Sequence, residues 1–348
     1  MSAALARRLR VMIVDDSAVA RQVLSAVLTA AGMDVQVAPD PLFAWEKLGR
    51  WDPDVLVLDL EMPRMDGLTF LRRLRRAGDL PVVICSGTTD GRGEKALRAL
   101  DEGAVEVVTK PKTAVREFLF ESSVMLVDAV TAAAKTRATL RPGRLRSATP
   151  SLGPPPRPST GRREIIALGA STGGPEAIRR VLGELPTTVP PVVVVQHMPA
   201  GFTSAFAKHL DQTCAIEVRE AVSGDRLRPG LALIAPGGRH LRVQRVGAAL
   251  EAVVVTGPLV SRHRPSVDVL FESVAECAGR NAVAALLTGM GDDGALGLGR
   301  LKTSGARTIA QDEATSVVYG MPKAAVDLGA VDETAPLEEL AATILSHC

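Results

Sequence analysis

The chain has 348 residues, a length typical of two domains, and 46% of its residues are hydrophobic while 23% are charged. These values are ordinary for globular domains and exclude a largely disordered chain. Aromatic residues make up only 3% and the formal net charge is +2. The low aromatic content argues against a surface that stacks nucleic-acid bases. The near-neutral charge gives no sign of attraction to phosphate backbones, so we expect no nucleic-acid partner.

The cysteines and the apolar runs indicate the cellular compartment. Four cysteines occur without paired spacing, so the sequence predicts neither a zinc site nor a disulfide framework. The apolar run 11–14 is too short for a signal peptide, and no apolar stretch approaches the roughly 18 residues of a membrane helix. We therefore expect a cytoplasmic protein without direct membrane insertion.

One segment, residues 135–163, differs from the rest in composition. It holds eight Lys or Arg, six prolines and no acidic residue, and such a composition cannot bury enough apolar surface to offset its chain entropy. Residues 1–134 hold 17 basic and 19 acidic side chains, and residues 164–348 hold 16 and 20. The sequence thus predicts two mildly acidic domains, 1–134 and 164–348, joined by a basic linker. The linker is either a solvated spacer or a contact for acidic surfaces.

Short β-branched runs alternate with helical patterns on both sides of the linker. Before it, the runs are 11–14, 35–37, 55–58, 82–85 and 105–108. After it, they are 165–168, 192–195, 231–234, 283–287 and 308–310. Apolar residues from Val19 to Ala30 have the spacing of one helical face, and Gly32 is suited to end that helix. Alternating strands and helices predict two α/β domains, each with a doubly wound parallel sheet.

Polar residues follow four strands of the first domain. They are Asp15 and Asp16, Asp59, Ser86 and Lys110. A single aspartate at a strand end is most often a helix cap, but the carboxyl ends of parallel strands meet at one edge, where all five side chains are predicted to converge. Three carboxylates in one place suit Mg²⁺, and one of them can then attack phosphorus while the lysine and the hydroxyl bind phosphoryl oxygens.

These residues, together with the segment 58–67 and Thr109-Lys110-Pro111, resemble the receiver domain of two-component response regulators over roughly the first 125 residues. The resemblance implies a flavodoxin-like fold, phosphorylation of Asp59 and a histidine kinase as phosphodonor. It also implies Mg²⁺ bound by Asp15, Asp16, Asp59 and the backbone carbonyl of Glu61, and a phosphoryl group bound by Ser86 and Lys110. Val107 departs from the pattern, because receivers commonly carry an aromatic switch residue there.

The first strand of the second domain runs into a turn of small residues, Gly169-Ala170-Ser171-Thr172-Gly173-Gly174-Pro175. Such a turn can lift a serine hydroxyl clear of the sheet as a nucleophile, or it can cradle a phosphate. The fingerprint Gly-x-Gly-x-x-Gly is absent, because position 171 is Ser, so nucleotide binding is the weaker interpretation. Glycine-rich turns also occur without chemistry.

A serine nucleophile needs a base and an orienting carboxylate. His197 follows the strand 192–195, and Asp292 and Asp293 follow the strand 283–287. A lone histidine at a strand end is more often structural. Because a serine and two aspartates are also predicted at strand ends of the same sheet, His197 is predicted to be the base. The other histidines are weaker candidates. His240 and His263 lie in segments rich in Gly or Arg and are predicted to make ordinary polar contacts, and no motif surrounds His209 or His347.

Several short segments resemble the chemotaxis protein-glutamate methylesterase family (CheB) over nearly all of residues 164–335. They are Ser171–Ala177, Gln196–Pro199, Ile234–Gly237, Arg262–Asp268, Thr288–Gly291 and Gly320–Pro322. The resemblance implies a Rossmann-like catalytic domain in which Ser171 is the nucleophile, His197 the base and Asp293 the orienting acid. Asp292 is the competing acid. Backbone N–H groups near Thr172 and Met290 are expected to stabilise the oxyanion.

The resemblance implies a function in chemotaxis adaptation. The enzyme would hydrolyse glutamate methyl esters, and deamidate glutamines, on the cytoplasmic helices of methyl-accepting chemoreceptors, with no cofactor for the esterase step. A chemotaxis histidine kinase would phosphorylate the receiver, which is expected to cover the serine site until then. We expect a monomer. The alternative is a receiver-linked adaptor that binds without catalysis, and a nucleotide-binding enzyme ranks third.

Overall fold

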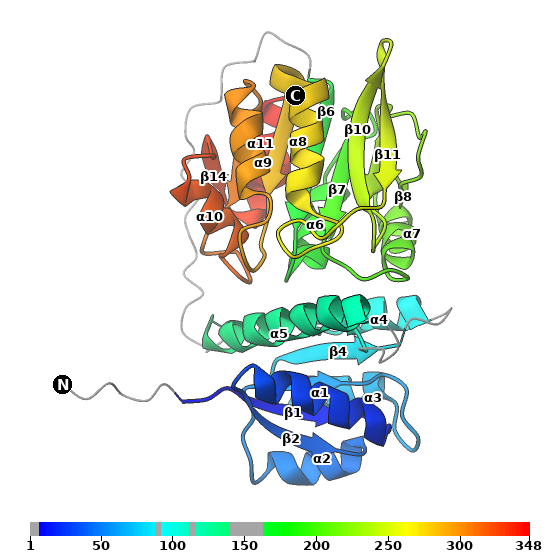
Figure 1. Ribbon diagram of the computed structural model, residues 1–348, viewed down its shortest axis with the longest axis vertical. Helices are drawn as coiled ribbons and strands as arrows, with labels where there is room; N and C mark the ends of the chain where they lie inside the picture. The colour runs from blue at the N-terminus through cyan, green and yellow to red at the C-terminus, as the bar shows by residue number, and fades with distance from the viewer. Residues whose placement is uncertain (1–6, 88–91, 111–115, 140–162) are drawn as a thin grey trace, which may run out of the picture. The chain divides into compact units, whose positions relative to one another are not determined.

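In a computed structural model, the chain folds into two compact units, residues 1–145 and 146–348 (Figure 1). The structure describes residues 7–87, 92–110, 116–139 and 163–348. Each unit is built on a parallel sheet with helices packed against it, which confirms the predicted α/β architecture. Within the described residues, no helix has the length and apolar character needed to cross a membrane.

The first unit contains a five-stranded parallel sheet with the order β2-β1-β3-β4-β5. The strands are β1 (Arg10–Val14), β2 (Asp34–Ala38), β3 (Val55–Leu58), β4 (Val82–Ser86) and β5 (Glu106–Thr109). All five match the predicted β-branched runs to within one residue at each end. The inner strands β1, β3 and β4 are recognisable in the sequence because both of their faces are buried, so each is a nearly continuous apolar run, whereas the edge strand β2 is partly exposed.

Five helices accompany this sheet. They are α1 (Ala18–Ala30), α2 (Pro41–Leu48), α3 (Gly67–Ala77), α4 (Arg92–Asp101) and α5 (Arg116–Thr139). Side chains cap the first three: Ser17 accepts from the Ala20 N–H, Asp40 from Leu42 and Asp66 from Thr69. The apolar sides of α1 and α5 pack on one face of the sheet, on side chains such as Val11, Ile13 and Val57.

The helix α5 extends into the segment that was predicted to be a linker. It continues to Thr139, so the first residues of the segment 135–163 are helical. Ala, Lys and Arg at positions 132–138 have high helix propensity, which explains the extension. Residues 140–162 of the predicted linker lie outside the described residues.

The second unit contains a seven-stranded parallel sheet with the order β14-β13-β12-β6-β7-β9-β8. Its strands are β6 (Ile165–Ala170), β7 (Val192–Gln196), β8 (Glu217–Glu220), β9 (Leu231–Ile234), β12 (Ala282–Leu286), β13 (Arg307–Gln311) and β14 (Glu333–Ala335). Five of them were predicted. The strands β8 and β14 lie at the two edges of the sheet and were missed, because they are short and mostly polar.

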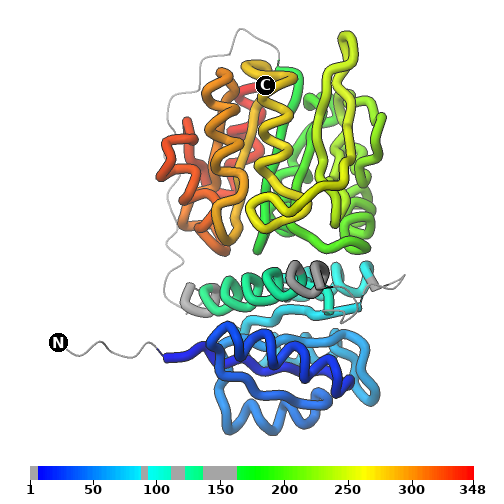
Figure 2. Tube along the Cα trace, in the orientation of Figure 1, coloured from blue at the N-terminus to red at the C-terminus, as the bar shows by residue number. Residues whose placement is uncertain are grey.

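An antiparallel hairpin was also missed. It consists of β10 (His240–Val246) and β11 (Ala249–Val255), and Figure 2 shows it as two long adjacent segments joined by a tight turn. Buried Leu241, Val243, Leu250 and Ala252 belong to the same core cluster as α8 and α9, so the hairpin helps to cover one face of the sheet. Its alternation of apolar and polar residues is a strand signal that a prediction of purely parallel strands overlooks.

The helices of the second unit lie on both sides of its sheet. They are α6 (Gly174–Gly183), α7 (Thr203–Thr213), α8 (Val267–Cys277), α9 (Ala295–Thr303), α10 (Met321–Asp327) and α11 (Leu337–Ser346), with a 3₁₀ turn at Gly279–Asn281. The helices α8 and α9 pack on the core through Leu270, Phe271 and Leu298, whereas α6 packs beside α7 and α11. This doubly wound arrangement confirms the predicted Rossmann-like fold class.

Candidate functional site

Three aspartates meet at the carboxyl edge of the first sheet. Asp15 and Asp16 follow β1, and Asp59 follows the neighbouring strand β3. Each offers a carboxylate oxygen, and these oxygens lie within 4.8 Å of one another. Asp15 and Asp59 are buried, whereas Asp16 is exposed. The structure thus brings together the three carboxylates that the sequence predicted to converge, and we call this group with Ser86 and Lys110 the carboxylate pocket.

Lys110, which follows β5, lies between two of these carboxylates. Its Nζ is 2.6 Å from Oδ2 of Asp15 and 2.7 Å from Oδ2 of Asp59. Burial acts to lower the pKa of Lys110, but its contacts with both aspartates outweigh burial and raise it. For Asp59, burial raises the pKa, although Lys110 acts in the opposite direction. The lysine therefore supplies the positive charge that allows two buried carboxylates to lie side by side.

The carboxylate pocket fits a divalent cation. Three hard carboxylate oxygens within 4.8 Å of one another are the donor set that Mg²⁺ prefers. Oδ2 of Asp15 is buried and is contacted by the ammonium of Lys110, so a cation in this pocket would share that carboxylate with the lysine. Glu61 lies in the loop after β3, where its side chain is 3.4 Å from Nζ of Lys95, and its backbone carbonyl stays a predicted ligand.

Ser86 and the β3–α3 loop complete this pocket. Ser86 is buried at the end of β4, and its hydroxyl has no hydrogen-bond partner among the described residues. Its carbonyl accepts from the Lys110 N–H at 3.0 Å, so the two residues are adjacent. The Gly67 N–H donates to Leu60, and a Cβ at Gly67 would collide with the carbonyl of Asp59. Only glycine fits where this loop folds back on Asp59.

The second unit places its predicted residues on three neighbouring strands. Ser171 follows β6, His197 follows β7 and Asp293 follows β12, and β6 lies between the other two strands. The chain leaves β6 toward β7 on one side and later returns to β12 on the other side. The three residues therefore lie at a topological switch point of the sheet, where loops diverge and leave room for a site. We call them the serine site.

The serine lies in a tight turn between β6 and α6. The Ser171 N–H donates to Thr288 at 3.0 Å, and its carbonyl accepts from Gly174 at 2.7 Å. Gly173 has a φ of 79°, and a Cβ there would collide with Val317. The turn therefore requires glycine, as its sequence indicated, and Pro175 lies in the first turn of α6.

Gln196 links the serine turn to the histidine and was overlooked as a site residue. It is fully buried at the end of β7, and its Nε2 donates to the carbonyls of Ser171 at 3.0 Å and His197 at 3.1 Å. A Cβ on Gly174 would collide with Gln196, so the turn and this side chain fit each other. A buried amide that ends a run of four valines was the signal in the sequence.

His197 and Asp293 form a buried pair. Nε2 of His197 is 2.7 Å from Oδ2 of Asp293, and the two residues are 5% and 1% exposed. The same carboxylate accepts from the Ser266 hydroxyl at 2.7 Å, the Val267 N–H at 2.7 Å and the Asp268 N–H at 3.1 Å. Burial would raise the pKa of Asp293, but these donors outweigh it and lower the pKa to about 2.

The structure distinguishes the two neighbouring acids. Asp293 is buried on His197, whereas Asp292 is exposed. Ser266 caps α8 and donates to Asp293 at the same time, so the start of α8 holds the carboxylate in place. Ser266 and Asp268 belong to a segment that carried the family resemblance, but the sequence did not identify them as support for Asp293.

The hydrogen bond to Asp293 also determines the tautomer of His197. An ionised carboxylate only accepts hydrogen bonds, so Nε2 carries a proton, and in the neutral imidazole Nδ1 then carries the lone pair. Nδ1 is buried and has no hydrogen-bond partner among the described residues. Ser171 Oγ makes no hydrogen bond to any of the described residues, so the structure shows no hydrogen bond between the serine and His197. In enzymes without substrate such a contact is often long.

Two backbone amides border the serine. A Cβ on Gly289 would lie 2.8 Å from Cβ of Ser171, which places the loop after β12 against the serine turn. Neither the Thr172 nor the Met290 N–H donates a hydrogen bond to the described residues. These are the two donors predicted for an oxyanion, and they have no competing acceptor there.

The remaining histidines near the site differ in their contacts. Nδ1 of His240 accepts from the Ser266 N–H at 3.2 Å, and its Nε2 donates to Pro258 at 2.8 Å, as expected of a polar structural residue. The same prediction was wrong for His263. Its ring stacks on the ring of His197, with centroids 3.8 Å apart and an interplanar angle of 13°. The short sequence motif around His263 was noted, but nothing local indicated its contact with His197.

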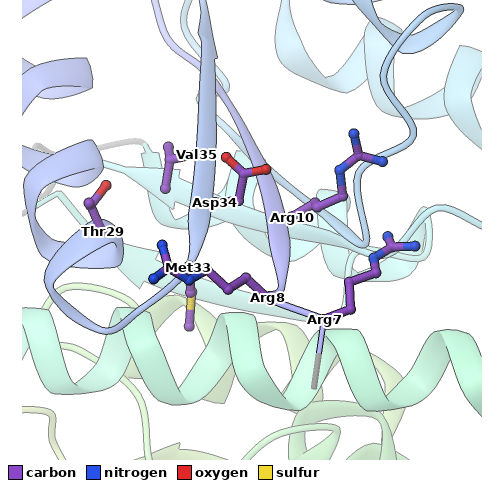
Figure 3. Close-up of a pocket in the computed structure, with 7 residues that line it drawn as sticks. All are labelled: Arg7, Arg8, Arg10, Thr29, Met33, Asp34 and Val35. Carbon is purple, nitrogen blue, oxygen red and sulfur yellow. The ribbon is translucent and has the colours of Figure 1, made fainter. Parts of the chain in front are cut away.

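The first unit also holds a basic hollow that is separate from the carboxylate pocket. It has a volume of about 580 Å³, and Figure 3 shows arginine side chains around it. Its lining residues are Arg7, Arg8, Arg10, Thr29, Met33, Asp34 and Val35. Arg10 and Asp34 begin parallel strands, so the hollow lies at the amino edge of the sheet, opposite the carboxylate pocket. Arg7 is paired with Asp54 at 3.0 Å.

Comparisons with known families agree with this division into two units. The CheB methylesterase family matches residues 166–344, and the response regulator receiver domain family matches residues 11–118. The crystal structure of the Thermotoga maritima CheB methylesterase catalytic domain is similar to the second unit. The two share 35% sequence identity with a TM-score of 0.52, covering 53% of this chain and 98% of that one.

Full-length relatives are more similar. A protein-glutamate methylesterase/protein-glutamine glutaminase of Anaeromyxobacter dehalogenans is 52% identical over 344 residues, which cover 97% of this chain and 98% of the relative. Another of the same description, from Rhodospirillum rubrum, is 49% identical over 356 residues and covers 97% and 98%. This chain therefore belongs to the CheB methylesterase family of enzymes and carries a response regulator receiver domain in its first unit.

Proposed function

We propose that this enzyme hydrolyses glutamate methyl esters on methyl-accepting chemoreceptors, and deamidates glutamines at such positions, under the control of phosphorylation. The observation that carries the proposal is the buried His197–Asp293 pair beside the serine turn. This pair supplies a base with a defined tautomer and a carboxylate that stays ionised. The printed descriptions of the relatives name the same two activities.

In the proposed reaction Ser171 is the nucleophile. Its Oγ attacks the ester carbonyl carbon, and Nδ1 of His197 takes the hydroxyl proton. The imidazolium is stabilised by Asp293, which is already ionised because its pKa is about 2. Collapse of the tetrahedral intermediate breaks the bond to the methoxy oxygen, and His197 returns the proton so that methanol leaves.

Water completes the cycle. His197 removes a proton from water and the resulting hydroxide attacks the acyl carbon. The bond from that carbon to Oγ then breaks, and His197 returns the proton to Oγ, which releases glutamate and restores Ser171. The N–H groups of Thr172 and Met290 would stabilise the oxyanion in both halves of the reaction, and no cofactor is required. A glutamine substrate follows the same route with ammonia as the leaving group, since only the atom that departs from the acyl carbon differs.

The carboxylate pocket supports the regulatory part of the proposal. The Asp59 carboxylate would attack the phosphorus of a phosphohistidine on a chemotaxis kinase, and the bond from phosphorus to the imidazole nitrogen would break. This leaves an acyl phosphate on Asp59 and the free histidine on the kinase, while Ser86 and Lys110 bind phosphoryl oxygens. Mg²⁺ held by Asp15, Asp16, Asp59 and the Glu61 carbonyl would supply positive charge for those oxygens. Phosphorylation of Asp59 is proposed to raise the turnover of the serine site.

A methanol-release assay on methylated receptor tests both parts. The full chain is measured with and without acetyl phosphate and Mg²⁺, beside the variant Ser171→Ala and the fragment 164–348. We expect turnover by the full chain to rise with the phosphodonor, and Ser171→Ala to release no methanol in either condition. Equal turnover by the full chain with and without the phosphodonor and by the fragment 164–348 would overturn the regulation, and methanol release by Ser171→Ala would overturn the nucleophile. Receptor binding without turnover would favour an adaptor.

A further inference from the structure

A strained turn places His263 against His197. Val260 and His263 exchange two backbone hydrogen bonds, at 3.1 and 2.9 Å, and thereby close a tight turn. The two residues between them, Ser261 and Arg262, have φ values of 49° and 68°. Glycine and asparagine are the usual residues in turns with two positive φ angles. Strain of this kind tends to persist at functional sites, where surrounding contacts hold it.

The turn is tied to the support of the catalytic carboxylate. The Ser261 hydroxyl donates to Oδ2 of Asp268 at 3.0 Å, and Oδ1 of Asp268 accepts from Gly297 at 2.8 Å. The N–H of Asp268 in turn donates to Asp293 at 3.1 Å. The start of α8 therefore holds both the carboxylate that orients His197 and the turn that carries His263.

The His197 ring needs a second restraint. Its only hydrogen bond within the described chain is the one from Nε2 to Asp293, because Nδ1 has no partner there. One hydrogen bond leaves the ring free to tilt about that bond. The nearly parallel ring of His263, 3.8 Å away by centroids, packs on one face of His197 and prevents that tilt.

His263 is suited to this position because it stays neutral. Burial, together with the nearby charge of His197, lowers the pKa of His263 to about 3. The other charged groups around the two rings are Asp293, Arg262 on the same turn and, through Ser261, Asp268. A neutral ring can lie against His197 without repelling the imidazolium that forms during catalysis.

From this geometry we propose that His263 is a positioning residue for the general base. Its ring holds His197 so that Nε2 points to Asp293 and Nδ1 is presented to the proton of Ser171. The inference rests on the proposed function of His197, but it concerns the orientation of a ring and can be tested without the natural ester. The His263 side chain makes no hydrogen bond within the described residues, so flat packing rather than polarity is its contribution.

The test combines two measurements on the full chain. Nitrogen NMR of ¹⁵N-histidine-labelled protein reports which nitrogen of His197 carries the proton. The rate of labelling by a fluorophosphonate reports the reactivity of Ser171, since Oγ bonds to phosphorus, fluoride leaves and His197 takes the proton. Ser171→Ala must remain unlabelled. Labelling of this variant as fast as the wild type would show that Ser171 is not the nucleophile. The NMR measurement would still test the role of His263, because it does not depend on the serine.

We expect His263→Ala to give a mixture of His197 tautomers and about tenfold slower labelling, since small displacements of a base are costly. His263→Phe keeps a flat ring and should retain the Nε2–H tautomer and the wild-type labelling rate within about threefold. His209→Ala, at a partly buried histidine of α7, is the matched control. If His263→Ala does not fold, His263→Gln replaces it.

Three outcomes would overturn the proposal. The first is a wild-type tautomer and labelling rate in His263→Ala. The second is slow labelling with an unchanged His197 tautomer, because His263 would then not act through His197. The third is a His263→Phe variant as slow as His263→Ala, which would show that a polar group rather than a flat ring is required.

Discussion

Asp59 of the first unit and Asp293 of the second both follow a buried parallel strand, but their surroundings differ. Asp59 shares a pocket with two further carboxylates and is approached by Lys110 at 2.7 Å. Asp293 instead accepts hydrogen bonds from His197, Ser266, Val267 and Asp268. One carboxylate lies among competing charges, whereas the other is surrounded by donors.

The difference is visible in the pKa values. Burial raises the pKa of Asp59 in spite of Lys110, whereas the donors around Asp293 lower its pKa to about 2. A carboxylate whose pKa is raised is the more basic one and suits an attack on phosphorus or the binding of a metal. One whose oxygens are engaged by donors can only orient and stabilise a partner. The same strand-end position thus suits the proposed nucleophile in one unit and the proposed orienting group in the other.

The largest expected effect is in the carboxylate pocket. Asp59→Asn should abolish acid-labile phosphorylation by acetyl phosphate, because the amide cannot form an acyl phosphate. Incorporation of labelled phosphate measures this, and removal of Mg²⁺ by EDTA from the wild-type chain should give the same result. Phosphate incorporation that persists in Asp59→Asn would assign the acceptor to another residue. Asp293→Asn serves as the control that still accepts phosphate.

The corresponding change in the serine site has the next largest effect. Asp293→Asn removes the charge that stabilises the imidazolium and the acceptor that determines the tautomer, so kcat for methanol release should fall about 10³–10⁴-fold. The neighbouring Asp292→Asn should change kcat less than about threefold, because that side chain is exposed. Losses of equal size in the two variants would contradict the assignment of Asp293.

A bulkier residue in the loop beside the serine turn tests how precisely the serine site must be positioned. In Gly289→Ala the new Cβ would collide with the Met321 side chain and lie 2.8 Å from Cβ of Ser171. Met321 is a flexible side chain that can move, but the serine turn must also shift, so kcat should fall about 10–100-fold. Gly299→Ala in α9 is the matched control. Its Cβ would meet only Cβ of Ala330, at 3.6 Å, and alanine favours a helix by about 0.5–1 kcal/mol. A fully active Gly289→Ala would show that the turn tolerates displacement.

The smallest expected effect is a pH dependence of stability in the second unit. The folded pKa of His263, about 3, is below its ordinary value of 6.5. The unfolded chain therefore binds the extra proton first, and the free energy of unfolding should fall on the order of 1–3 kcal/mol as pH drops from 6.5 toward 4. Asp268, with its pKa raised to about 6, acts in the opposite direction between pH 3.8 and 6.

Because these two titrations oppose each other, the effect of His263 is measured as the difference in pH dependence between the wild type and a variant that lacks its titrating ring. Urea unfolding of residues 164–348 at several pH values is compared for the wild type and His263→Phe, which lacks the titrating ring. The wild type should lose more stability than the variant between pH 6.5 and 4. Identical pH dependence would show that protonation of His263 is not linked to unfolding.

Much of both sites was predictable because their residues occupy strand ends. In each unit the buried strands were nearly continuous apolar runs, so the positions of Asp59, Ser171, His197 and Asp293 followed from where those runs stop. Polar edge strands and the antiparallel hairpin had no such signal and were missed. Gln196, Ser266 and Asp268 were visible only as members of short motifs, because their hydrogen-bond partners lie far away in the sequence.

The sequence by itself determined the fold class, the strand ends and the chemistry carried to them, because apolar periodicity and turn residues are local properties. Only the tertiary structure decided the strand order β12-β6-β7, which of two adjacent aspartates accepts from His197, and which nitrogen of that ring is left open. It also decided that His263 stacks on His197 across 66 positions of chain. Such contacts depend on how distant segments pack, and no local pattern encodes that packing.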